Sequence, residues 1–83
     1  MTNTDPIQTA AALFVMKGWN IVEEGYTLDD FRLSWGATTN QVLVDLIHAG
    51  TARFFVVDVV DHLDAHGVAV GVGFQARQVA TPR

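Results

Sequence analysis

The chain has 83 residues, of which 49% are hydrophobic and 17% charged, with no cysteine and a formal net charge of -4. This length fits a single domain, residues 1–83, and the absence of cysteine excludes disulfides, thiolate metal sites and cysteine nucleophiles. The acidic balance excludes a strong overall attraction to nucleic acid or anionic membranes, and the high apolar fraction is typical of a folded chain.

The first predicted helix begins after Asp5, with Pro6 at its first position, and ends at Lys17 and Gly18. Aspartate is a favourable N-cap residue, and proline is tolerated at the first helical position because the N–H that it lacks would have no helical partner there. Glycine commonly follows the last turn of a helix. The longest apolar run, residues 10–16, is far shorter than the roughly 20 residues of a membrane-spanning helix. No basic residues precede it as in a signal peptide, so we expect a cytoplasmic protein. The predicted apolar stripe of the helix comprises Ile7, Ala10, Ala11 and Phe14, with Leu13 as an optional further member.

Two further helices are predicted between residues 27 and 50. Thr27 is followed three residues later by an acid, the spacing of a capping box, and this helix would end at Gly36. Thr38 and Gln41 have the same spacing, and this third helix would end at Gly50. Its apolar arc is wider than one buried side requires, which predicts contacts on more than one side.

After residue 50 the apolar period changes from 3.6 to 2. Residues 53–60 are rich in Val and Phe and predict a strand covered on both faces, and residues 68–77 alternate as a second strand. Gly71 and Gly73 leave one face of that second strand bare, which favours the close approach of another element. The predicted fold is therefore α+β, with three short N-terminal helices followed by a β-hairpin and residues 19–22 as a candidate third strand.

A different interpretation of residues 19–35 stays open. Ile21, Leu33 and Trp35 could lie in strands that join the later hairpin, giving an antiparallel sheet packed on the first and third helices. The capping box at Thr27 favours the helix.

Residues 27–55, TLDDFRLSWGATTNQVLVDLIHAGTARFF, resemble winged helix-turn-helix domains of the excisionase or MerR kind. The resemblance rests on a capped short helix, Gly36 in the turn, Val42 six residues later, and LIHAG before a strand. It implies a winged-helix-like fold in which the hairpin is the wing.

The resemblance also implies a DNA-binding regulator, with Thr39, Asn40 and Gln41 as the residues that read bases. However, no Lys or Arg lies between residues 33 and 52. DNA-binding proteins draw much of their affinity from neutralising phosphates with several cations. We therefore keep DNA binding as the alternative function and do not expect nucleic acid as the main partner.

The densest polar cluster contains Asp58, Asp61, His62, Asp64 and His66. Imidazoles and carboxylates are ligands that zinc and similar divalent ions accept, so a metal-binding turn at 58–66 is a third candidate function. Turn geometry explains the same residue types, and we expect no metal.

The sequence offers few candidate catalytic residues. Ser34 is the single serine, and no base lies at a suggestive spacing from it. We expect neither an enzyme nor a cofactor.

The apolar residues exceed what so short a monomer can bury. Phe54 and Phe55 are adjacent in a predicted strand and must point to opposite faces. Large exposed apolar patches usually mark interaction sites. We predict a small non-catalytic protein-interaction module that forms a homodimer or binds a protein partner. The predicted interface comprises Leu43, Val44, Ile47, Phe54, Phe55 and Val57.

Overall fold

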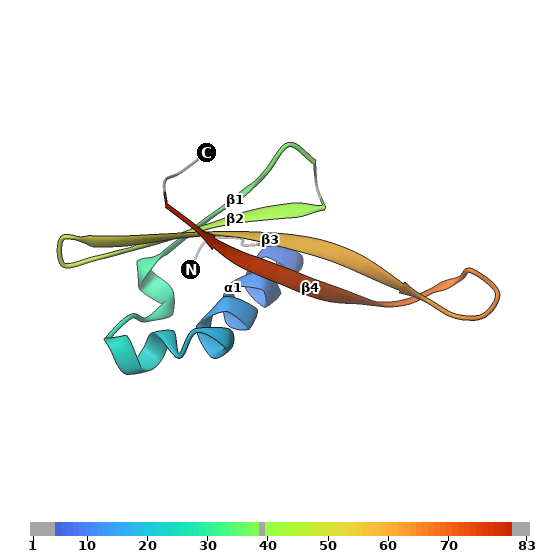
Figure 1. Ribbon diagram of the computed structural model, residues 1–83, viewed down its shortest axis with the longest axis horizontal. Helices are drawn as coiled ribbons and strands as arrows, with labels where there is room; N and C mark the ends of the chain where they lie inside the picture. Colours follow the sequence, from blue (N-terminus) through green and yellow to red (C-terminus); the bar gives the residue numbers. More distant parts are fainter. Residues whose placement is uncertain (1–4, 39, 81–83) are drawn as a thin grey trace.

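The structure is a computed structural model that describes residues 5–38 and 40–80. In these residues, one α-helix and two 3₁₀ turns precede a four-stranded antiparallel sheet whose strand order, β1-β2-β3-β4, follows the chain (Figure 1). The elements are helix α1 (Pro6–Gly18), turns η1 (Ile21–Glu24) and η2 (Leu28–Asp30), and strands β1 (Phe31–Trp35), β2 (Gln41–His48), β3 (Thr51–Leu63) and β4 (Ala69–Val79).

Helix α1 begins and ends where the sequence predicts. The Asp5 carboxylate accepts a hydrogen bond of 2.8 Å from the backbone N–H of Ile7, and Pro6 is the first helical residue. The predicted stripe is correct for Ala11, which is buried, and wrong for Leu13 and Phe14, which are 48% and 41% exposed. The buried side consists of small residues, Ala11, Ala12 and Val15, so the helix can lie close to the sheet.

The prediction of three helices followed by a hairpin is wrong. The capping box at Thr27 forms: Thr27 Oγ1 accepts from the N–H of Asp29 at 3.3 Å, and the Asp30 carboxylate accepts from the N–H of Thr27 at 2.9 Å. It caps only the three residues of η2, because the chain then pairs as β1 with β2. Leu33 and Trp35 lie in β1, as the alternative interpretation had it.

The third predicted helix is strand β2. Its supposed cap is a turn between strands: Thr38 Oγ1 accepts from the N–H of Asn40, and Thr38 O accepts from the N–H of Gln41, both at 3.2 Å. Side chains that cap helices stabilise tight turns through the same local hydrogen bonds. The wide apolar arc belongs to the two faces of a strand, and the winged-helix-like arrangement is therefore wrong as well.

Gly50, which suggested the end of the third predicted helix, lies in the turn between β2 and β3. Ala49 and Gly50 both have positive φ, 50° and 83°, as in the two-residue hairpin turn of type I′. An L-residue with a Cβ is strained in this left-handed conformation, whereas asparagine tolerates it.

Ala49→Asn is therefore expected to stabilise the protein. Relief of about 1 kcal/mol would raise the melting temperature by about 4–8 °C in a domain of this size. Ala49→Val, which adds a β-branch at the same position, should lower the melting temperature. Equal melting temperatures of the three proteins in thermal unfolding followed by circular dichroism would contradict this account of the turn.

Residues 19–22 do not form the candidate third strand, because residues 21–24 form η1, with Ile21 fully buried. The two strands of the predicted hairpin are confirmed, although β3 continues to Leu63. The turn after it is held by the carboxylate of Asp64, which accepts from the N–H groups of His66 and Val68.

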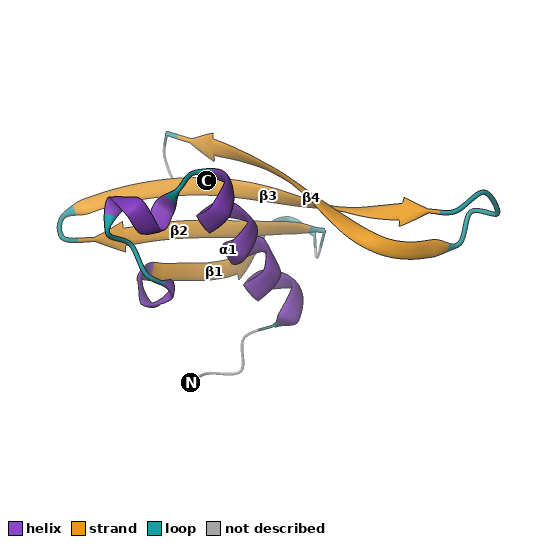
Figure 2. Ribbon diagram, turned by 90° about the horizontal axis from the view of Figure 1, so that it is seen from below, coloured by secondary structure: helices purple, strands orange, loops and turns teal. Residues whose placement is uncertain are grey.

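α1 and the two 3₁₀ turns lie on one side of the sheet (Figures 1 and 2). The core fills the space between these layers and contains Ala11, Ala12, Val15, Ile21, Tyr26, Phe31, Val42, Val44, Leu46, Phe55 and Val57. Within residues 5–38 and 40–80, no helix is both long enough and apolar enough to cross a bilayer.

The end of the β3–β4 hairpin projects beyond the other strands (Figure 1). β2 pairs with β3 as far as Asp58, so from the pair Val60 and Gly73 onward only two strands remain. We call residues 60–73 the arm. It contributes to a long molecule of 48 × 24 × 24 Å, and its Val70 is 66% exposed.

Candidate functional site

The side of the sheet away from α1 carries a continuous set of side chains. In the register, Leu43 lies opposite Val56 and Asp45 lies opposite Phe54, alternating with the buried core residues of β2 and β3. No helix or strand of the described residues covers this side (Figure 1). We call it the open face, consisting of Arg32, Ser34, Leu43, Asp45, Ile47, Phe54, Val56, Asp58, Val60 and Arg77.

The open face is more apolar than a solvated sheet face normally is. Antiparallel sheets with one side in water alternate apolar residues inward and polar residues outward. β3 departs from this rule, because three of the outward positions, Phe54, Val56 and Val60, are apolar and only Asp58 among them is charged. On β2, Ile47 is 49% exposed. The apolar surface that the sheet presents to solvent comes from the exposed Ile47 and Val60 and the half-buried Leu43 and Phe54, whereas Val56 lies on the same face but is only 1% exposed.

Charges on the open face balance. Arg77 Nη1 lies 3.2 Å from Asp58 Oδ2, and Arg32 lies directly opposite Asp45 in the register. Two arginines and two aspartates give the face a formal charge of zero, whereas the chain carries -4. The acidic excess therefore belongs to other parts of the molecule.

The predicted interface residues divide between the two sides of the sheet. Leu43, Ile47 and Phe54 lie on the open face. The remaining three, Val44, Phe55 and Val57, are fully buried in the core. Val56 and Val60 were not among the predicted interface residues, although strict alternation from Phe54 places both on the same face.

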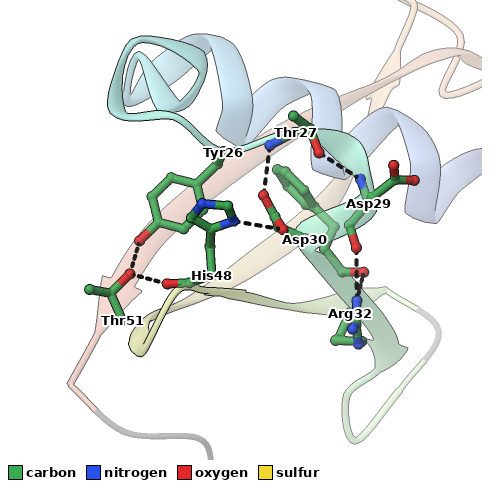
Figure 3. A network of polar contacts seen from close by, with 8 residues as sticks. Tyr26, Thr27, Asp29, Asp30, Arg32, His48 and Thr51 are labelled. Carbon is green, nitrogen blue, oxygen red and sulfur yellow. Dashed lines mark hydrogen bonds and ion pairs between the residues drawn. The ribbon is translucent and has the colours of Figure 1, made fainter.

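A polar network fastens η2 to the β2–β3 turn (Figure 3). Thr51 Oγ1 donates to the carbonyl of His48 at 2.7 Å and lies 3.0 Å from the Tyr26 hydroxyl, and His48 Nδ1 lies 3.1 Å from Asp30 Oδ1. The hydrogen bond from the Thr27 N–H, with the contact to His48, lowers the pKa of the Asp30 carboxyl. These hydrogen bonds fix the side chains of Tyr26, Asp30, His48 and Thr51 relative to one another, and so hold η2 against the β2–β3 turn.

Arg53 ties together three elements on the helix side of the sheet. Its Nη1 donates to both carboxylate oxygens of Glu24 at 2.7 and 2.8 Å, and its Nη2 donates to Gln78 Oε1 at 2.9 Å. The guanidinium carbon lies 5.4 Å from the ring centroid of Phe55. A fork-shaped donor matches this set of acceptors, so Arg53 links η1 to β3 and β4.

The two described residues among those expected to read DNA bases, Asn40 and Gln41, do not lie on a helix. Asn40 is in the β1–β2 turn, Gln41 begins β2, and Thr39 lies outside the described residues. The three described arginines all bond within the protein: Arg53 to Glu24, Arg32 to the backbone carbonyls of η2 and β1, and Arg77 to Asp58.

The candidate metal ligands are dispersed along the arm and its turn. Asp61 and His62 are neighbours in β3 and point to opposite faces. The Asp64 carboxylate holds the turn that contains His66, as described above. In the part of the chain that the structure describes, no group of three or more such side chains comes together.

Comparisons with known protein families, with curated proteins and with solved structures find no significant match to this chain.

Proposed function

We propose that this chain is a small, non-catalytic protein-interaction module that self-associates through the open face. The observation that carries the proposal is the apolar set Leu43, Ile47, Phe54 and Val60, half-buried or exposed on the open face together with the buried Val56, on a sheet whose other side is covered by α1. Contiguous apolar surface of this kind usually marks a site of association.

Charge favours a second copy of the chain as the occupant. Two acidic proteins repel one another when their charged surfaces meet, but the open face has equal numbers of arginines and aspartates. Two such faces can therefore meet without a net electrostatic penalty. Two antiparallel sheets stack at about 10 Å with their strands about 30° apart, and their inner side chains interdigitate.

Phe54→Asp tests this proposal. A carboxylate at the centre of an apolar contact is expected to weaken self-association by about 30-fold, which corresponds to the roughly 2 kcal/mol typical of a central interface residue. Sedimentation velocity over a concentration series measures the effect, and far-UV circular dichroism checks that the variant remains folded.

The matched control is Leu13→Asp. Leu13 is similarly apolar and 48% exposed, but it lies on α1, on the other side of the sheet. It should associate as the original protein does. A protein that remains monomeric at all concentrations, or equal association of both variants, would contradict the proposal.

A further inference from the structure

Strand β4 is an unusually long and unprotected sheet edge. Among the described residues it pairs only with β3, along 11 residues, whereas the opposite edge strand β1 has five. Sheet edges are commonly protected by proline, by lysine, by bulges or by being short. β4 contains neither proline nor lysine, and its register shift lies at the arm end, opposite His62 and Leu63. A row of backbone donors and acceptors is therefore open to another strand.

The side chains of β4 are complementary to themselves when the strand is reversed about Phe74. In an antiparallel pair centred there, Gly71 of one copy lies opposite Arg77 of the other, and Gly73 lies opposite Gln75. On the other face Val72 would lie opposite Ala76. Each small residue thus meets a larger one. Gly71, where a Cβ would have nothing within 4 Å, leaves room for the long Arg77 side chain of the other copy, whereas the space over Gly73 is taken by the His62 ring of the same chain.

The centre of this arrangement already carries an aromatic contact. The Phe74 ring lies 5.6 Å from that of Phe14, and Phe14 is 41% exposed. A two-fold axis at Phe74 would bring both pairs of rings together. Aromatic pairs across strands stabilise antiparallel pairing in addition to the ladder hydrogen bonds.

We infer that β4 pairs with β4 of a second copy, antiparallel and centred on Phe74, so that two sheets become one continuous sheet of eight strands. The partner of this edge is a second copy of the chain, because the strand's own sequence supplies the matching register. The inference adds a second surface to the self-association proposed above. Together, the face contact and the edge contact would close a tetramer with two kinds of two-fold interface.

Disulfide trapping tests the register directly, since the chain has no cysteine of its own. Gly71→Cys and Arg77→Cys are prepared as separate variants carrying different tags and are then mixed under mild oxidation. Opposed Cα atoms of an antiparallel pair lie about 4.5–5.5 Å apart, within the range of a disulfide. We expect the mixed dimer to form. Position 71 is suitable because a Cβ there would have nothing within 4 Å.

Each variant alone is the control for register. In the inferred pairing, position 71 of one copy lies opposite position 77 of the other. The two copies of position 71 are therefore separated by six residues along the strand direction, or about 20 Å, and so are the two copies of position 77. Neither variant alone should cross-link. The inference is overturned if the mixture does not cross-link, or if either variant alone cross-links as well as the mixture does.

Two opposite charges at position 71 check the contact without oxidation and leave Arg77 with its partner Asp58. Gly71→Arg places an arginine opposite Arg77 and should weaken the edge contact, whereas Gly71→Glu places a carboxylate there and should strengthen it. Equal association of the two variants would contradict the inferred register.

The outcomes separate the two contacts. In the Phe54→Asp background the mixed cross-link should persist, because Phe54 is not on β4. If Phe54→Asp reduces association while cross-linking fails in both backgrounds, the edge pairing is wrong and the open-face contact stands. If cross-linking succeeds but Phe54→Asp leaves association unchanged, the open-face proposal is wrong and the edge pairing stands.

Discussion

Phe55→Ala is expected to lower the free energy of unfolding by about 3–5 kcal/mol. Phe55 is fully buried and is among the largest side chains of the core, and its ring meets that of Trp19 edge to face at 4.9 Å. Truncation leaves a cavity between α1 and the sheet and removes the surface on which the Arg53 guanidinium rests. A chain of this length typically has a total stability of about 4–12 kcal/mol, so the variant would be close to unfolding.

The neighbouring phenylalanine provides the control. Phe54 lies on the open face, so Phe54→Ala should lower the free energy of unfolding by about 1 kcal/mol or less. Urea titration, at a protein concentration too low for association, compares the two variants. Equal losses would show that the two faces of β3 are not buried as the structure has them.

Val44→Asp should prevent folding at neutral pH. Val44 is fully buried on the core side of β2, opposite Leu33 and Phe55. An ionised carboxylate there would lose its hydration without gaining a partner. The free energy of this desolvation exceeds the free energy that stabilises the folded domain. The far-UV circular dichroism spectrum of the variant should be that of an unfolded chain.

Ile47→Asp places the same charge on the same strand. Ile47 is 49% exposed on the open face, so this variant should fold and should associate more weakly. Val44 and Ile47 were both predicted to belong to one interface, and these two substitutions separate them. A folded Val44→Asp protein would show that β2 does not present residue 44 to the core.

Local signals in the sequence were reliable for the boundaries of α1 and for the β3–β4 hairpin. Asp5 and Pro6 determine a helix start almost independently of tertiary contacts, and alternating Val and Phe residues determine a strand. The signals at residues 27–50 were ambiguous, because a threonine followed by an acid or an amide stabilises a helix start and a tight turn with the same hydrogen bonds. Pairing between β1, β2 and β3, which no local pattern reveals, decided the outcome.

The candidate site could be predicted only in part, for the same reason. Adjacent apolar residues such as Phe54 and Phe55 indicate that both faces of a strand are apolar, but they do not indicate which face a helix covers. That assignment depends on where α1 packs, and α1 packs on the side of Phe55. Half of the predicted interface residues therefore lie in the core.

The agreement between strand order and chain order has a consequence for how the molecule folds. Every strand pairs with its neighbour in sequence, so each pairing closes only a short loop, at little entropic cost. Topologies dominated by such local contacts fold quickly, and the hairpins could form one after another as the chain is synthesised. Helix α1 leaves the ribosome before the strands, so its buried side has no surface to pack on until β2 and β3 have formed.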